Sequence, residues 1–104
     1  MMKSRSDDHL DRMFYALSDR TRRKMLMALT SGELSVSDLG EPFGMSKQSI
    51  SKHLKVLEEA GLVKKQKDGR IQRCQFDMDN FAIVQSVVDE YREFWEQQFD
   101  ALED

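Results

Sequence analysis

The sequence has few of the residues that build disulfides, metal sites and redox centres. It contains one cysteine, Cys74, and two histidines among its 104 residues. One cysteine excludes a disulfide within the chain and is compatible with a reducing compartment. Apolar runs stay short of the roughly 18 residues that a membrane span needs, and the first residues lack the apolar centre of a secretory signal peptide. The sequence therefore predicts a cytoplasmic protein with no membrane association.

Patterns that are typical of enzymes are missing as well. The sequence has no Gly-rich phosphate-binding loop, no nucleophile with a base at usable spacing and no convincing pair of carboxylates. We therefore expect neither catalysis nor a cofactor. What is present is a chain with 39% hydrophobic and 34% charged residues. This composition and length are typical of one globular domain, spanning residues 1–104.

Charge is sorted along the chain, although the net charge is only −3. Residues 46–76 contain eight Lys and Arg against three acids, whereas residues 77–104 contain nine acids against one base. This separation predicts one surface that attracts an anion and another that is turned away from it.

Residues 46–60 have the pattern of a capped amphipathic helix. Ser46 is a suitable N-cap, and Met45 and Ile50 are spaced for a hydrophobic staple. Gly61 is placed to end the helix in a left-handed conformation. The stripe expected to face the core consists of Ile50, Leu54 and Leu57.

The opposite face of this helix carries cations and hydrogen-bond donors. They are Lys47, Gln48, Ser49, Ser51, Lys52 and Lys55. Such a face suits the base edges and phosphates of a DNA major groove, although a charged helix face is more often simply solvated. The neighbouring segments decide between the two interpretations.

Residues 35–43 predict a short supporting helix directly before it. Ser35 and Asp38 resemble a capping box, and Leu34 and Leu39 are spaced for a second staple. A tight turn with a glycine joins the two helices, so residues 35–60 predict a helix-turn-helix whose second helix is the recognition helix.

Two further helices are expected upstream, over residues 8–17 and from residue 18 or 19 to about residue 30. The second begins with four cations, Arg20, Arg22, Arg23 and Lys24. Cations at a helix N-terminus oppose the helix dipole. A solvated surface or an ion pair with Asp19 is the favoured explanation, and a bound phosphate is the alternative.

Two short strands, over residues 63–67 and 70–76, flank the dipeptide Asp68-Gly69, which is a strong hairpin signal. Closing the hairpin there would place like charges opposite one another, Lys67 with Arg70 and Lys64 with Arg73. Such pairs are unfavourable in a solvated ribbon. Residues 63–76 are therefore predicted to form a wing that contacts DNA phosphates through Lys64, Lys67, Arg70 and Arg73.

Residues 79–103, opened by Asp79 or Asn80, predict the longest helix. Its apolar surface is wider than one small domain needs, so it either closes the core or forms an interface. We favour a homodimer in which this helix and residues 8–17 pack against their symmetry mates and present two recognition helices to a palindromic site. The expected interface residues are Leu10, Phe14, Val84, Val88, Tyr91, Trp95 and Leu102.

Three segments, Phe14–Arg23, Gly32–Leu39 and Ser46–Val63, together resemble the ArsR/SmtB family of bacterial winged helix-turn-helix repressors. The resemblance covers about residues 10–76 in order and spacing. It implies a mainly α fold with a small β-hairpin, and a homodimeric repressor that an inducer of unknown identity releases from double-stranded DNA. It also implies DNA contacts from Lys47, Gln48, Ser49, Ser51 and Lys52 of the recognition helix and from Lys67 and Arg70 of the wing.

The chain departs from the metal-sensing members of that family. Where those members have Cys-x-Cys, this chain has Ser35 and Ser37, whose hydroxyls are poor ligands for zinc or arsenite. Residues 77–104 contain neither His nor Cys, which those members that bind metal on the last helix would need. We therefore expect no metal site and a place in a non-metal branch.

Two other interpretations stay open. The fold could serve as a winged-helix module that binds a protein partner through its acidic last helix. Alternatively, Cys74, expected to face inward opposite Val63, could make the chain a redox-sensing repressor. His53 is interpreted as a packed structural histidine.

Overall fold

A computed structural model describes residues 5–103 as five α-helices around a small sheet. The helices are α1 (Arg5–Leu17), α2 (Arg20–Leu29), α3 (Val36–Gly40), the 3-10 helix η1 (Glu41–Phe43), α4 (Lys47–Glu59) and α5 (Met78–Glu103). The strands are β1 (Leu34–Ser35), β2 (Val63–Asp68) and β3 (Ile71–Phe76). The predicted fold class, mainly helical with a small antiparallel hairpin, is confirmed.

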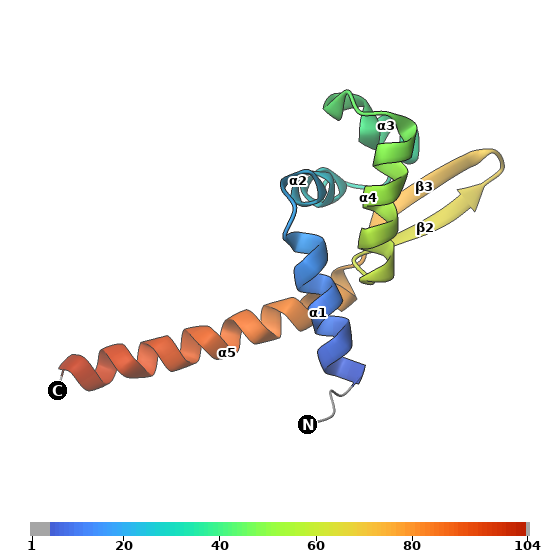
Figure 1. The fold of residues 1–104 in the computed structure, drawn as a ribbon. Helices are drawn as coiled ribbons and strands as arrows, with labels where there is room; N and C mark the ends of the chain where they lie inside the picture. Colours follow the sequence, from blue (N-terminus) through green and yellow to red (C-terminus); the bar gives the residue numbers. More distant parts are fainter. Residues whose placement is uncertain (1–4, 104) are drawn as a thin grey trace.

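The molecule is elongated because its last helix leaves the body. Figure 1 shows α5 extending to one side while α1 to α4 and the hairpin gather at the other end. The principal extents are 61 × 32 × 21 Å. At 1.5 Å per residue, the 26 residues of α5 account for about 39 Å of that length.

The core lies between α1, α2, α4 and the sheet. The predicted inward stripe of α4, Ile50, Leu54 and Leu57, is buried there, together with Met13 of α1 and Met25, Leu26 and Leu29 of α2. In α1, which begins at Arg5 rather than at residue 8, Ala16 is fully buried, whereas Phe14, an expected interface residue, is 44% exposed. The apolar stripe of α1 is therefore only partly covered by its own protomer.

Both predicted caps of α4 are confirmed. The Ser46 hydroxyl accepts a hydrogen bond from the Ser49 amide at 3.2 Å. At the other end, Gly61 has a φ of 75°. The amides of Gly61 and Leu62 donate to carbonyls of the last turn at 2.9 and 3.0 Å, which satisfies backbone groups that would otherwise lack partners.

The supporting helix is shorter than predicted. The Ser35 hydroxyl accepts from the Asp38 amide at 3.1 Å, as expected of an N-cap. However, α3 ends at Gly40, and the chain continues as the 3-10 helix η1, which begins beside Pro42, a residue without an amide hydrogen. A Cβ on Gly40 would lie 2.8 Å from the Ile50 side chain, so this glycine allows α3 and α4 to approach closely.

The sheet contains one strand that the sequence did not predict. β1 pairs antiparallel with β3, with Leu34 opposite Cys74 and Ser35 opposite Arg73, and gives the strand order β1-β3-β2. Two residues are too few to show the alternation by which strands are recognised. This short strand fixes the wing to the start of the helix-turn-helix.

The predicted hairpin register is wrong. The observed pairs are Val63–Phe76, Lys64–Gln75, Lys65–Cys74, Gln66–Arg73, Lys67–Gln72 and Asp68–Ile71. The two turn residues are Gly69 and Arg70 rather than Asp68 and Gly69. None of the predicted like-charged pairs forms, and Cys74 lies opposite Lys65 instead of Val63. Self-repulsion within the wing therefore gives no support to a DNA-binding role.

The turn explains the difference in register. Gly69 has a φ of 63°. Within residues 5–103 only glycines have a positive φ, so Arg70, the second turn residue, has a negative one. A glycine with positive φ at the first of two central positions is characteristic of a type II′ hairpin turn. At the open end of the hairpin this register places Val63 opposite Phe76, and Val63 is buried in the core.

The start of α5 and one of its predicted interface residues also differ from expectation. The cap is Asp77 rather than Asp79 or Asn80, because the Asp77 carboxylate accepts the Asn80 amide at 3.1 Å. Val84 is 5% exposed and belongs to the core of its own protomer. Within residues 5–103, no helix has both the length and the apolar character needed to cross a membrane.

Candidate nucleic-acid interface

The predicted recognition face of α4 lies in solvent. Five of its six side chains are exposed, and they are Lys47, Gln48, Ser51, Lys52 and Lys55. Ser49 is half-buried and is occupied by the N-cap, because its hydroxyl accepts a hydrogen bond from the Ser46 hydroxyl at 3.1 Å. The opposite stripe of α4 is buried, so the exposed face is fixed in direction by the core.

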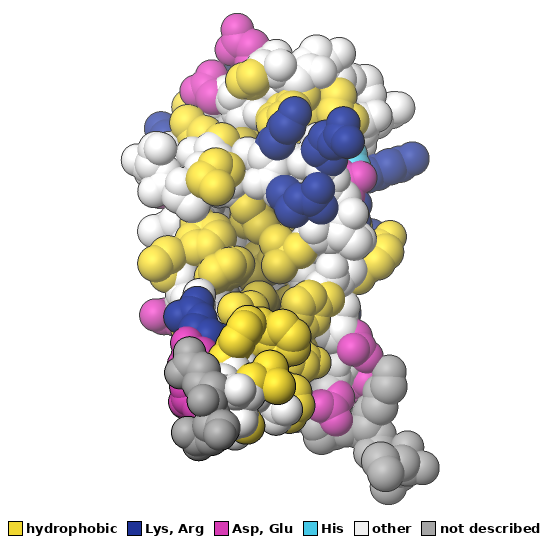
Figure 2. All heavy atoms as spheres, turned by 90° about the vertical axis from the view of Figure 1, so that its left-hand side faces the viewer, with side chains coloured by type: hydrophobic (Ala, Val, Ile, Leu, Met, Phe, Trp, Pro, Cys, Tyr) yellow, Lys and Arg dark blue, Asp and Glu magenta, His cyan; other side chains and the backbone are white. Residues whose placement is uncertain are grey.

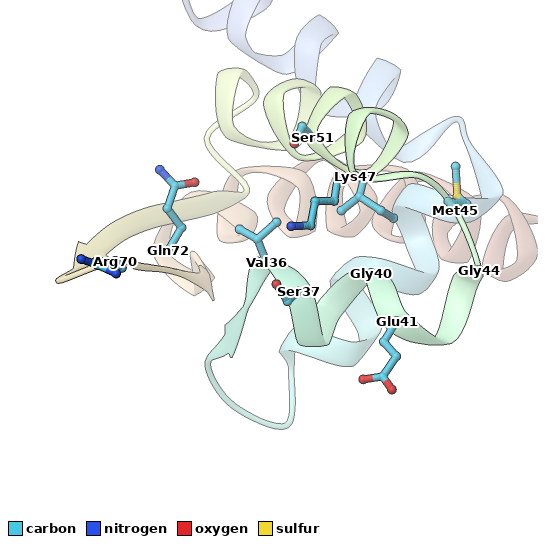
Figure 3. A pocket seen from close by; sticks show the side chains of 11 residues that line it. Val36, Ser37, Gly40, Glu41, Gly44, Met45, Lys47, Ser51, Arg70 and Gln72 are labelled. Atoms are coloured by element: carbon cyan, nitrogen blue, oxygen red, sulfur yellow. The ribbon is translucent and has the colours of Figure 1, made fainter.

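A groove of about 360 Å³ joins this face to the supporting helix and to the wing. Lys47 and Ser51 line it from α4, Ser37 from α3, and Arg70 and Gln72 from the wing. Figure 3 shows Lys47 extending over the groove between α3 and α4. The structure thus brings together residues that lie more than twenty positions apart in the sequence.

Gln72 and Ser37 line the groove although the sequence does not predict them as DNA contacts. The predicted strand 70–76 contains a signal for Gln72, because residues two apart on a strand share a face and Gln72 follows Arg70 by two. The sequence marks Ser37 only as a residue in the place of a metal-binding cysteine. Its place in the groove comes from the packing of α3 against α4.

The cations of the wing fall into two groups. Lys64 lies 3.7 Å from Asp77, and Arg73 lies 3.6 Å from Glu33 and 3.5 Å from Asp68. By contrast, Lys67 and Arg70 are exposed and form no ion pair with any residue from 5 to 103. The second group keeps its charge available for an external anion.

The cations of α2 also differ from one another, and a solvated surface does not account for Arg22. Arg22 is only 7% exposed, and its guanidinium donates to the carbonyls of Ala16 at 2.8 Å and Tyr15 at 3.0 Å. Asp19 caps α2 by accepting the backbone amide of Arg22 at 3.0 Å. This hydrogen bond is the main reason why the pKa of Asp19 lies below its usual 3.8.

Cys74 is fully buried, as predicted, and this position opposes a redox role. Burial raises the pKa of the Cys74 thiol above its usual 9.0, which lowers the population of the reactive thiolate. Among the side chains of the described residues, no cluster of His, Cys, Asp and Glu has the arrangement of a metal site. Of the two serines that replace the cysteines of metal sensors, Ser35 is used as a helix cap.

A second surface of the molecule is rich in exposed apolar side chains. Figure 2 shows hydrophobic side chains gathered on the side toward which α5 projects, with Lys and Arg side chains nearby. A hollow of about 600 Å³ there lies between α2, the end of β3 and the first turns of α5. Farther along α5 the exposed apolar residues are Val88, Tyr91, Phe94, Trp95, Phe99 and Leu102. No described residue of the same protomer covers them.

Comparison with known proteins identifies the family. Residues 19–65 match the family of bacterial regulatory proteins called arsR. The transcriptional repressor SdpR of Bacillus subtilis is 39% identical over 61 residues, which are 59% of this chain and 68% of that protein. The chain belongs to the arsR family. The HTH-type transcriptional regulator Rv2034 of Mycobacterium tuberculosis is 35% identical over 81 residues, 78% of this chain and 76% of that protein.

Solved structures agree with this assignment to the arsR family. The crystal structure of an ArsR family transcriptional regulator is similar with a TM-score of 0.81 and 35% identity, over 92% of this chain and 97% of that one. A homodimeric winged helix-turn-helix DNA-binding domain from Mycobacterium bovis, solved by NMR, has a TM-score of 0.68 and 30% identity over 88% and 93%. The predicted family, the winged helix-turn-helix fold and the class of DNA-binding transcriptional regulator are confirmed.

Proposed function

We propose that this arsR-family protein is a repressor that binds a palindromic operator in double-stranded DNA as a homodimer in the bacterial cytoplasm. The observation that carries the proposal is the groove that joins α4 to the wing. Lys47 and Ser51 of α4 share this groove with Arg70 and Gln72. A recognition helix in the major groove and a wing on the flanking backbone would use these two surfaces at once.

The proposed contacts follow from exposure and pairing. Gln48, Ser51 and Lys52 are exposed in the first half of α4 and would contact base edges, where Gln and Lys have defined partners. Ser49 is a weaker candidate because it is occupied by the helix cap. The residues proposed to contact phosphates are Lys47, Lys55, Lys67 and Arg70. The sequence predicts the same role for Lys64 and Arg73, but each would first have to leave an ion pair. We therefore expect these two residues to contribute less to the affinity for DNA.

The homodimer is supported by the uncovered half of α5 and by the homodimeric relative from Mycobacterium bovis. A second copy would bury aromatic side chains that one protomer leaves in water. The proposed interface residues are Leu10, Phe14, Val88, Tyr91, Trp95 and Leu102, without Val84. In addition, α5 carries most of the acidic residues of the chain's C-terminal part, which would keep this helix away from DNA phosphates.

We also propose that the protein has no catalytic activity and that its effector, if it responds to one, is not a metal held at the serine positions. This part rests on the chemistry of the residues. Ser35 is engaged as a helix cap, and the thiol of Cys74 is buried in the core, away from solvent.

The central experiment selects DNA from a random pool and measures binding by fluorescence anisotropy over a salt series. We expect an inverted repeat and an affinity that falls steeply with salt, because each neutralised phosphate releases counterions. Gln48→Ala should relax discrimination at one base position by about 1–3 kcal/mol. Lys24→Ala removes an exposed cation from α2, outside the groove, and serves as the charge-matched control for variants in the wing.

Two results would contradict the proposal. One is the absence of DNA binding, or binding that does not depend on salt. The other is a stoichiometric protein partner recovered by pull-down together with no footprint on DNA, which would favour the protein-interaction module.

A further inference from the structure

Arg22 is a buried cation that joins two helices outside the proposed DNA contacts. Its Nε donates to the carbonyl of Ala16 at 2.8 Å, and its Nη2 donates to the carbonyl of Tyr15 at 3.0 Å. Both carbonyls belong to the last turn of α1, and that of Tyr15 also accepts from the amide and the hydroxyl of Ser18. The guanidinium carbon also lies 5.1 Å from the centre of the Tyr15 ring. Arg22 therefore caps α1 from α2.

The remaining arm of the guanidinium reaches the recognition helix. Nη1 of Arg22 lies 3.4 Å from Nδ1 of His53, a residue of α4. A guanidinium has donors only, so a hydrogen bond in this contact requires Nδ1 as the acceptor. The same Nδ1 lies 3.9 Å from the carboxylate of Asp19, the N-cap of α2. His53 directly follows Lys52, which belongs to the exposed recognition face.

We propose that Arg22 and His53 are positioning residues that set the place of α4 relative to α1 and α2, and thereby the aim of the side chains that read bases. This inference rests on the proposed DNA-binding function. The physical reason is that hydrogen bonds to base edges need narrow distances and angles, whereas contacts between flexible cations and phosphates tolerate small displacements. A shift of α4 would therefore weaken recognition of sequence before it weakens attraction to DNA.

His53→Ala and His53→Gln are the decisive pair of variants. His53→Ala removes the acceptor on α4 but leaves the hydrogen bonds from Arg22 to α1 in place. His53→Gln restores a side-chain oxygen that can accept from Arg22. Because Arg22→Ala also removes the cap of α1 and can prevent folding, Arg22→Lys is used instead. It keeps one cation able to donate to the α1 carbonyls, but it cannot also reach His53.

The measured quantity is the ratio of the affinity for the selected operator to the affinity for unrelated DNA at the same salt concentration. Thermal unfolding establishes a temperature at which every variant is folded. We expect His53→Ala and Arg22→Lys to lower this ratio by about fivefold, the low end of the cost of one lost base contact. His53→Gln should restore most of it. A purely structural role would lower both affinities by the same factor.

The inference is overturned if wild-type protein discriminates the operator from unrelated DNA, and both His53→Ala and Arg22→Lys have the same ratio of affinities as the wild type. It is also overturned if His53→Gln loses as much discrimination as His53→Ala. Failure of the proposed function looks different, because wild-type protein would then show no salt-dependent binding to any DNA.

Discussion

Gln72 lies directly opposite Lys67 in the wing. Side chains on a strand alternate between its two faces, so both share the face of Lys65, whose ammonium lies 3.1 Å from Glu58 of α4. Gln72 also lines the groove that contains Lys47 of α4. The wing therefore turns hydrogen-bond donors toward the recognition helix, while Lys64 and Arg73 lie on the other face.

The unpaired and the paired cations of the wing should differ in their contribution to DNA binding. Arg70→Ala should weaken binding to all DNA sequences alike, because it removes an unpaired cation that is proposed to contact a phosphate. It should reduce the slope of log affinity against log salt concentration by about 1 per protomer. Lys64→Ala should have a much smaller effect, since Lys64 already pairs with Asp77. Anisotropy titrations over a salt series measure both variants. Equal slopes for the two would contradict the distinction between paired and unpaired cations.

A charge in the uncovered half of α5 should separate the proposed dimer. Trp95 is 61% exposed in the protomer and lies 5.5 Å from Phe99 between ring centres. Trp95→Glu should shift the protein to a monomer, because the carboxylate would lose its hydration in an apolar interface. Sedimentation velocity measures this shift. Gln97→Glu adds the same charge to an exposed position two residues farther along, and it should leave the dimer intact.

A folded monomer of Trp95→Glu should also bind the operator more weakly, because two linked recognition helices then become independent. If wild-type protein sediments as a monomer at concentrations at which it binds DNA, the proposed interface is wrong.

The carboxylate of Asp19 should stabilise the fold in a way that depends on pH. Its folded pKa is depressed below 3.8, chiefly by the hydrogen bond from the Arg22 amide. The stabilisation is therefore present above 3.8 and is lost as the pH falls through the lower folded value. Asp19→Ala should cost about 1 kcal/mol of unfolding free energy at neutral pH, the usual value of an N-cap.

Urea unfolding at a series of pH values tests this expectation for Asp19. The difference between wild type and Asp19→Ala should shrink as the pH falls below 3.8. Asp19→Asn keeps a cap that does not titrate, so its advantage over Asp19→Ala should stay constant. If the difference in unfolding free energy between wild type and Asp19→Ala grew in acid, the folded pKa of Asp19 would be raised and not lowered.

The thiol of Cys74 should be unreactive in the folded protein. It is fully buried, and burial raises its pKa above 9.0. Modification by a thiol reagent should be slower than in the urea-unfolded chain by about a hundredfold or more, because it requires opening of the core. Cys74→Ser should leave operator binding unchanged in oxidant. Rapid modification of the native protein, accompanied by release of DNA, would support the redox-sensing alternative.

Much of the fold was predictable because its signals are local. The Ser46 cap, the Gly61 terminus and the stripe of Ile50, Leu54 and Leu57 depend on spacing within one helix, and all three are confirmed. Hairpin register is less local. The Asp68-Gly69 signal located the turn to within one residue, but the choice between two neighbouring turns also depends on how Val63 and Phe76 pack against the core.

The site was predictable in part for the same reason. Solvent exposure of the α4 face follows from amphipathic spacing, and five of its six selected side chains are indeed exposed. Pairing of charges does not follow from spacing. Nothing in the order of residues indicated that Lys64 would meet Asp77, or that Arg22 would turn inward to the carbonyls of α1.

By itself, the sequence determined the kind of molecule: a helix-turn-helix with a hairpin wing, a sorted charge distribution and the motifs of the arsR family. These properties depend on local spacing and composition. Only the tertiary structure decided which cations remain unpaired, that Gln72 joins Lys47 in one groove, and that Arg22 contacts His53. Such contacts arise between segments that are distant in the chain, and their geometry is set by how the whole core packs.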